Sequence, residues 1–425
     1  MSEVRTFNLA QTVQAAPRWA RIYLPASGMD ALVETLWLFT LGWQASRAGW
    51  AAGIVLSAGA APAIAFVLWG GSLADRLGAH RIAAWTMTAR VVVMSAWAAL
   101  LIYGNAPAYT VAAGAFATGA IAGLHDPAVS ALPRLLVPAA GLEASTNAQR
   151  LCIRLVQTIG PGLGGLLAGL FDVPTVAVVA AAIGLVPLAA FAVLRRVRPV
   201  SDSDSDSVSD SDRGSASDHD ADGALLAGLR WIRSHPAVRR TVPVQAAVNL
   251  TSATIVMAAL PSQARAYGWG AGIYGLATAA FGGGMLLGSL AAFGIRDRAP
   301  RRKVAIAVAC AALSSIMVAV TGAASSGTIA VVAAGLMGLA IGPVGSVLTG
   351  WTLATSVQSN AALYGRVYAV LLLVTVSGEP LGFLVFAGLA GVTSTATTSI
   401  IFGLVGFLVA LYALGSRSVR MIQIG

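Results

Sequence analysis

The sequence predicts an all-α polytopic membrane protein with twelve transmembrane helices in two pseudo-symmetric halves of six. Hydrophobic residues make up 57% of the 425 positions and charged residues only 10%, against about 25% charged residues in soluble domains. The apolar residues form runs of about 20, which is the length an α-helix needs to cross a bilayer. A soluble fold of this composition would expose aggregation-prone apolar surface, so the composition excludes the soluble class.

Twelve apolar runs of bilayer length follow one another along the chain. Six precede a polar interruption, at 22–43, 50–73, 82–103, 108–131, 147–170 and 174–194. Six follow it, at 242–264, 271–294, 303–321, 327–351, 364–390 and 394–414. The first run is long enough to span, so we expect it to remain as a helix rather than be cleaved as a signal peptide.

The basic residues predict the orientation of these runs. The loops on one side carry most of them, at Arg76, Arg81, Arg134, Arg195 to Arg198, Arg230 to Arg240, Arg296 to Lys303 and Arg366. The loops on the other side carry only Arg47 and Arg265. By the positive-inside rule, we expect a multi-pass protein of the cytoplasmic membrane with both termini in the cytoplasm. The net charge of +10 then reflects topology, and we expect no nucleic-acid partner.

Nothing in the sequence predicts an enzyme or a bound cofactor. Cys152 and Cys310 lie far apart in apolar runs, so they indicate neither a disulfide nor a metal site. No phosphate-binding loop, Ser/His/Asp arrangement or Cys/His cluster is present in the sequence.

The second half of the sequence repeats features of the first at a nearly constant offset. Gly-Ser-Leu-Ala begins at Gly71 and again at Gly288, and Pro127 and Arg150 match Pro343 and Arg366. An ordered series of this kind indicates six helices duplicated in parallel around a central cavity, a known transporter layout. We therefore expect an N-terminal half, a cytoplasmic linker and a C-terminal half, at 1–198, 199–240 and 241–425.

The predicted linker contains a run of alternating Ser and Asp from Ser201 to Asp222. With almost nothing to bury, this run cannot offset the entropy cost of ordering, and we expect it to be a disordered tether. The stretch 225–232 is typical of a short amphipathic helix at the inner membrane surface.

The loop after the second run carries Gly71, Asp75, Arg76 and Gly78, followed by Arg81. The pattern Gly-x-x-x-Asp-Arg-x-Gly resembles the corresponding loop of the major facilitator superfamily, and the resemblance covers essentially the whole chain. It implies the major facilitator fold and a gating role for these loop residues.

Further motifs resemble those of proton-coupled antiporters in that family. The fifth run carries Gly-Pro-x-x-Gly-Gly at Gly160, Pro161, Gly164 and Gly165, a pattern that in the family indicates export. The sequences Asp126-Pro127-Ala128, Asn147-Ala148 and Glu379-Pro380-Leu381-Gly382 resemble the third drug:proton antiporter group, which includes macrolide and siderophore exporters. Taken from the residues alone, the glycines also suit a plain helix-packing interface.

Charged residues inside the predicted membrane runs are candidates for coupling transport to protons. Asp30 and Glu34 lie one helical turn apart, roughly 13 and 20 Å into the bilayer. Two carboxylates this close do not both ionise readily, so we expect one of them to carry a proton. Asp126 and Glu379 are further candidates, although Asp126 also suits a purely structural pair.

Two arginines inside the runs are the expected charge partners. We expect Asp126 to pair with Arg154, and Arg90 to meet Asp30 unless it extends to the inner surface. His125, next to Asp126, is either a proton relay or a satisfied histidine near a helix end, and its position favours the second.

We expect a proton-coupled secondary exporter of amphipathic organic compounds, of the drug, antibiotic or siderophore class. Its partners are then a small-molecule substrate, protons and the lipid bilayer, and we expect a monomer. The alternative is an importer of a small polar solute, for which Gln245 and Asn249 are the available polar groups. A non-transporting sensor is the third reading, and no additional soluble domain in the sequence supports it.

Overall fold

The computed structural model of the protein describes residues 18–104, 106–136, 139–194, 218–298, 302–359, 363–416 and 419. All regular secondary structure in these ranges is helical. The predicted Ser-Asp tether lies outside the described residues as far as residue 217. Its last part, 218–222, is helical, which corrects the expectation of disorder there.

The N-terminal bundle consists of six long helices. Their bounds are α2 Arg18–Ala45, α3 Ala52–Leu77, α4 Ala79–Tyr103, α5 Ala108–Leu136, α6 Ala139–Leu170 and α7 Val173–Leu194. A short 3-10 turn, η1 (Ser46–Ala51), joins the first two. Helix α3 ends at Gly78, whose φ of 91° is readily adopted only by glycine. This residue makes the tight turn into α4 that the loop motif predicts.

The C-terminal bundle repeats this arrangement after α8 (Asp218–Ser234), which covers the predicted amphipathic stretch. Two of its spans contain a π-helical segment. These spans are α9 (Pro236–Thr254), η3 (Ile255–Ala259) and α10 (Leu260–Ala266), and then α13 (Gly327–Pro343), η4 (Val344–Thr349) and α14 (Gly350–Ser359). The remaining helices are α11 Gly270–Arg298, α12 Lys303–Gly322, α15 Leu363–Val392 and α16 Thr395–Leu414.

The predicted class, an all-helical protein that crosses the membrane many times, is confirmed. Within the described residues, nine stretches are long and apolar enough to cross a bilayer, and the first, Ile22–Val67, contains most of α2 and most of α3. Several helices run beyond the apolar runs, because a helix continues into polar sequence after it leaves the region that hydropathy detects.

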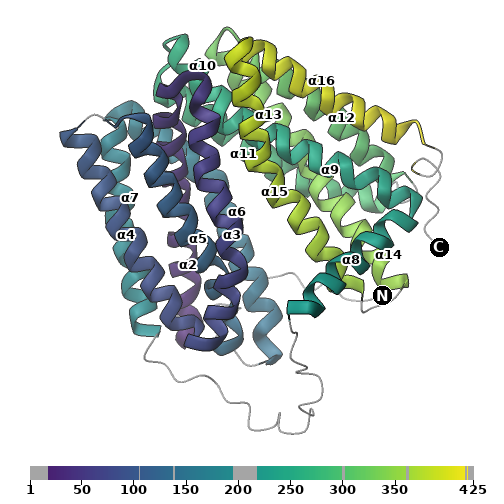
Figure 1. Ribbon diagram of the computed structural model, residues 1–425, viewed down its shortest axis with the longest axis horizontal. Coiled ribbons are helices and arrows are strands. Elements are labelled where there is room, and N and C mark those ends of the chain that lie inside the picture. The colour runs from purple at the N-terminus through teal and green to yellow at the C-terminus, as the bar shows by residue number, and fades with distance from the viewer. Residues whose placement is uncertain are drawn as a thin grey trace.

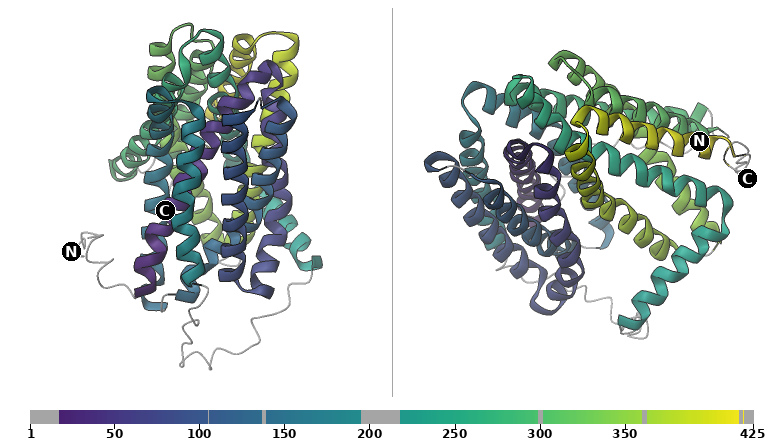
Figure 2. Two further views of the ribbon diagram at one scale, coloured as in Figure 1. Left: turned by 90° about the vertical axis from the view of Figure 1, so that its left-hand side faces the viewer. Right: turned by 45° about the horizontal axis from the view of Figure 1, so that its top comes forward.

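Figure 1 shows the two bundles side by side, the N-terminal one in purple and blue and the C-terminal one in green and yellow. They meet at the end that contains α10, called the far end below, and diverge toward the end that contains α8, called the linker end. The tilted view on the right of Figure 2 also shows the two bundles side by side.

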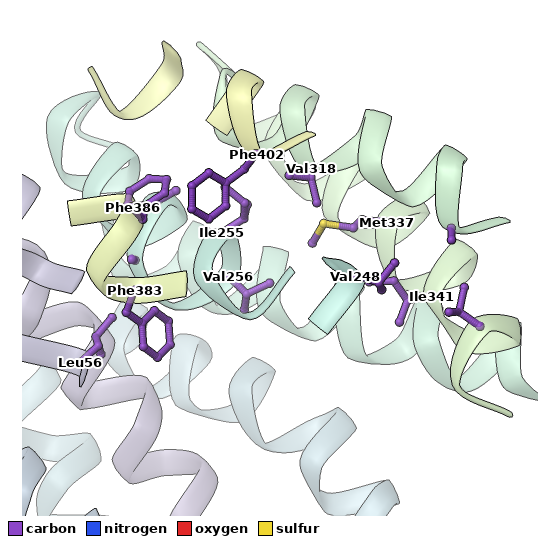
Figure 3. Close-up of a cluster of buried hydrophobic side chains, with 14 of the residues drawn as sticks. Leu56, Val248, Ile255, Val256, Val318, Met337, Ile341, Phe383, Phe386 and Phe402 are labelled. Carbon is purple, nitrogen blue, oxygen red and sulfur yellow. The ribbon is translucent and has the colours of Figure 1, made fainter. Parts of the chain in front are cut away.

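Apolar side chains from both bundles belong to one continuous core, which also extends through the C-terminal bundle as far as Trp231 of α8. Figure 3 shows Leu56 of α3 near Phe383 of α15, and Phe386 near Phe402 of α16. The rings of Phe386 and Phe402 meet edge to face, with centroids 5.5 Å apart. In this conformation the core therefore joins the bundles at the far end.

Candidate functional site

A single buried carboxylate connects three helices of the N-terminal bundle. Asp30 of α2 accepts a hydrogen bond from Arg90 Nη1 of α4 at 2.8 Å, and its other oxygen lies 2.9 Å from His125 Nε2 of α5. The exposed fractions of the three residues are 7%, 3% and 1%. A buried ion pair is tolerated when its oxygens and N–H groups have partners. Here both oxygens of Asp30 are used.

The local packing of α2, α4 and α5 places these side chains. Trp37 and Trp97 meet edge to face, with ring centroids 5.3 Å apart, between α2 and α4. The Tyr23 hydroxyl of α2 donates to the backbone oxygen of Val129 in α5 at 3.0 Å. These contacts hold the three helices in register around Asp30.

The second ring nitrogen of His125 is also engaged. Nδ1 lies 2.7 Å from the hydroxyl of Thr86 on α4, and this hydroxyl also lies 2.7 Å from the backbone oxygen of Ile82. The rings of His125 and Phe191 of α7 meet edge to face, with centroids 5.9 Å apart. Both ring nitrogens of His125 thus have hydrogen-bond partners, as expected of a satisfied histidine, and one partner is Asp30. The residue lies well inside α5 and not near a helix end, which corrects that part of the expectation.

Two further carboxylates lie around this group. Glu34 is one turn further along α2 and half-buried, and Asp126 is exposed on α5. Both are close enough to interact electrostatically with Arg90. We call Asp30, Glu34, Arg90, His125 and Asp126 the Asp30 cluster. Its carboxylates outnumber its one permanent cation, so a bound proton reduces its excess negative charge.

The structure does not form the expected pair between Asp126 and Arg154. The ion pairs found among the described residues both involve Asp30. Arg154 lies one turn before Thr158 on α6, and the Thr158 backbone lies against Gly282 of α11. That face of α6 is turned toward the C-terminal bundle, and Arg154 is exposed.

Glu379 is not part of the Asp30 cluster. It lies on α15, exposed, and makes no ion pair within the described part of the chain. The adjacent Pro380 accepts a hydrogen bond through its carbonyl from Ser57 of α3 at 3.1 Å. Glu379 therefore lies close to a point where the two bundles touch.

The loop motif lies at the linker end. Gly71 is in α3, Gly78 forms the turn, and Arg76 and Arg81 are exposed. The side chain of Asp75 lies outside what the structure describes, so the gating role of this loop stays a prediction.

The Gly-Pro-x-x-Gly-Gly motif packs on two helices at once. Side chains added at Gly160 and Gly164 would meet Thr35 and Phe39 of α2 at 2.7 and 3.0 Å. One added at Gly165 would overlap Gly275 of α11, in the other bundle. Pro161 contributes its carbonyl to the same contact, 3.0 Å from a side chain placed at Gly275. The motif thus allows close approach between the bundles near the far end.

Polar and aromatic contacts complete the far-end junction. Arg265 Nη2 donates to the backbone oxygen of Trp43 at 2.9 Å, and its Nε donates to the Ser46 hydroxyl at 3.0 Å. The guanidinium also lies 4.4 Å from the centroid of the Trp43 ring. Tyr274 stacks on Phe39 with centroids 5.0 Å apart. The hydrogen bonds found between the described parts of the two bundles all lie toward this end.

Known structures share this fold. The nucleoside transporter NupG aligns with a TM-score of 0.68 at 14% identity, covering 94% of this chain and 99% of that chain. A POT family transporter in complex with 5-aminolevulinic acid aligns at 0.66 and 14% identity, covering 97% and 100%. A D-xylose-proton symporter aligns at 0.63 and 15% identity, covering 96% and 97%. Identities this low show a shared fold only.

Sequence comparison assigns the family. No curated protein sequence matches the chain. The family model described as Major Facilitator Superfamily matches residues 22–245, which is more than half of the chain. The protein is therefore a secondary transporter of small molecules rather than an enzyme, and it belongs to the Major Facilitator Superfamily.

Proposed function

We propose that the protein is a proton-coupled exporter of amphipathic organic compounds, of the drug, antibiotic or siderophore class, in the cytoplasmic membrane. The observation that carries this proposal is the buried Asp30 carboxylate, shared between Arg90 and His125 within a membrane bundle. Ionisable groups at such a depth are costly, and by default they serve a pathway or a proton site.

The distribution of basic residues supports a cytoplasmic position for the linker end. The exposed arginines there include Arg76, Arg81, Arg230, Arg233 and Arg366. At the far end, by contrast, Arg265 is engaged with Trp43. With this orientation, the bundles are joined on the outer side and diverge toward the cytoplasm, as an exporter requires when it loads its cargo.

The Asp30 cluster offers a mechanism for coupling. A proton entering the cluster reduces its excess negative charge and changes the hydrogen bonds that hold α2, α4 and α5 together. Glu34 and Asp126 are the carboxylates through which a proton can pass, since both are more accessible than Asp30. Glu379 is a separate candidate at the contact between the bundles.

The alternative function is import of a small polar solute. The polar groups available for this role in the C-terminal bundle are already partly engaged. The Gln245 side-chain oxygen accepts from the Thr349 hydroxyl at 2.8 Å, and the Asn249 amide donates to the Gln245 backbone oxygen at 3.1 Å. This engagement favours the export hypothesis.

Transport in proteoliposomes tests the proposal. The purified protein is reconstituted, and the movement of an amphipathic dye or a macrolide is followed after a proton gradient is imposed. We expect proton entry to drive dye in the opposite direction, and we expect the double variant Asp30→Asn/Glu34→Gln to lose this response. Asp172→Asn, an exposed carboxylate in a far-end loop, is the matched control.

A gradient that drives no test compound, or a double variant that still responds fully, would overturn the proposal. Size-exclusion profiles and melting curves show whether each variant is folded. Accumulation of a polar solute by intact cells, with no extrusion of amphipathic compounds, would favour the importer.

A further inference from the structure

We propose that the proton binds at Nδ1 of His125, and that Thr86 is the positioning residue that allows it to bind there. The role of this site in transport rests on the proposed function, but the proton site itself rests on hydrogen-bond geometry. The inference follows from counting the hydrogen atoms available to Thr86, His125 and Asp30.

The Thr86 hydroxyl has one hydrogen and more than one acceptor for it. Its oxygen lies 2.7 Å from the Ile82 backbone oxygen, 3.2 Å from the Ala83 backbone oxygen and 2.7 Å from His125 Nδ1. Carbonyl oxygens only accept, whereas an imidazole nitrogen accepts or donates according to its protonation. The hydroxyl therefore donates either to the backbone or to His125.

These two choices correspond to two protonation states. When the hydroxyl donates to Nδ1, the ring is neutral and its proton on Nε2 is donated to Asp30 over 2.9 Å. When the hydroxyl donates to Ile82, its oxygen is free to accept from a protonated Nδ1. Nε2 still donates to Asp30, and the ring is an imidazolium. Every polar atom has a partner in both states.

Binding of the proton therefore requires no movement of heavy atoms. A proton arrives from the aqueous side, an N–H bond forms at Nδ1, and the Thr86 hydroxyl rotates toward the backbone. Within the hydrogen-bonded chain of Thr86, His125 and Asp30, the alternative position for the proton is Asp30. A proton there would remove the buried counter-charge of Arg90, which lies 2.8 Å away, and a buried charge without a partner is costly.

The charges that face His125 suit an imidazolium. Helix α2 contributes Asp30 and Glu34, with the hydroxyl of Tyr23 committed to Val129. Helix α4 contributes Arg90, which opposes the added charge, and α5 contributes Asp126, which favours it. Helix α7 contributes the uncharged Phe191. The cluster thus has three carboxylates and one permanent cation, and its Asp126, the residue next to His125, is exposed.

The first test titrates the histidine directly. The full-length chain, labelled with ¹⁵N-histidine and held in lipid nanodiscs, contains four histidines, and His125→Gln assigns the signal of interest. We expect the neutral ring to carry its proton on Nε2, and acidification to add a second proton at Nδ1. Thr86→Val should lower the midpoint by about 1 pH unit, a roughly tenfold loss of proton affinity, because the imidazolium loses its acceptor.

Thr88→Val is the matched control. Thr88 lies on the same helix and donates to the Ala84 backbone oxygen at 2.8 Å, so we expect this variant to titrate like the wild type. A His125 ring that stays neutral at every pH at which the protein remains folded would overturn the proposal. So would a neutral ring protonated at Nδ1, or equal midpoints in the Thr86 and Thr88 variants.

The second test separates this inference from the proposed function. In the dye assay, the pH profile of Thr86→Val should move in the same direction as its titration, and His125→Gln should abolish the response to a proton gradient. If His125 titrates as expected but no compound responds to the gradient in the wild type, the proposed function fails and the proton site stands. If the wild type responds and His125→Gln responds equally, the inference fails and the proposed function stands.

Discussion

Replacing Gly165 by alanine should shift the protein away from the conformation in which its bundles meet at the far end. A Cβ at this position would overlap the Cα of Gly275, and it would lie 3.0 and 3.1 Å from the carbonyl carbon and the nitrogen of the same residue. Ordinary contacts begin near 3.4 Å. All three atoms belong to the backbone, so no side chain can rotate away and α6 and α11 have to separate.

The expected magnitude follows from the cost of overpacking. One extra carbon in a closely packed contact costs about 1–3 kcal/mol. Here the cost falls on the conformation in which the two helices touch, so the population of that conformation should drop roughly 5- to 150-fold relative to its alternative. Gly169→Ala is the matched control, because a Cβ there would lie 3.6 Å from Gly272 Cα, an ordinary contact.

Spin labels at the far end measure the shift. Tyr103 of α4 and Val392 of α15 are 87% and 80% exposed, so cysteines at these positions accept labels without disturbing the core. The native Cys152 and Cys310 are replaced first. Electron–electron distance measurements should give a longer-distance population in Gly165→Ala that Gly169→Ala lacks. Identical distributions in the two variants, both folded by melting curves, would refute the reasoning.

Arg90→Met should lower stability by about 3–5 kcal/mol because Asp30 stays buried without its counter-charge, and melting curves should show part of this loss restored by adding Asp30→Asn; an additive loss would contradict this. Arg265→Lys should weaken the far-end contact by about 1–2 kcal/mol, because an ammonium does not reproduce the two-pronged guanidinium, and should lengthen the spin-label distance. Two hydrogen bonds from Thr175 hold the pKa of the Asp172 carboxyl below its usual value. The pKa of Asp172 is lower in the folded state than in the unfolded state. The stability it contributes is therefore fully present above the unfolded pKa of about 4, and it is lost as the pH falls through the lower folded-state pKa. Asp172→Ala should therefore lower the free energy of unfolding by about 0.5–1 kcal/mol at neutral pH, and by progressively less in acid. The value is at the low end for the loss of a helix cap because the side chain is exposed.

The fold was predictable because membrane helices can be recognised in a sequence by the length and hydropathy of their apolar runs. The π-helical turns were not. A π turn adds one residue to a helical turn without changing its composition, so the runs containing η3 (Ile255–Ala259) and η4 (Val344–Thr349) look like uninterrupted helices in sequence. The helix ends that extend beyond the apolar runs were not predicted for a related reason. Helix α9, for example, begins at Pro236, among polar residues that a hydropathy criterion leaves out.

The site was predictable only where the depth of a charged residue in the membrane determines which residue it contacts. Asp30, Arg90 and His125 lie at similar depth in their runs, and this signal was enough to suggest that Arg90 meets Asp30. Depth was insufficient for Arg154, because contact also requires that two helices turn the right faces toward each other. The contact between Thr86 and His125 was not predicted for the same reason. Helices α2 and α4 are apolar on nearly all sides, so the sequence pattern does not indicate which face of each turns inward.

Helix α2 lies between the proton site and the contact that joins the bundles. One of its faces carries Asp30, and another carries Thr35 and Phe39, which pack on the glycines of α6 that border Gly165. A change in the cluster that moves α2 should therefore alter the far-end contact. The position of α2 between the two sites is not by itself evidence that they are coupled. If they are coupled, the effects of variants at the two sites should not be additive. Combined in one chain, Thr86→Val and Gly165→Ala should change the spin-label populations by at least about 0.5 kcal/mol more or less than the sum of their separate effects. Strict additivity would mean that the proton site and the far-end contact act independently.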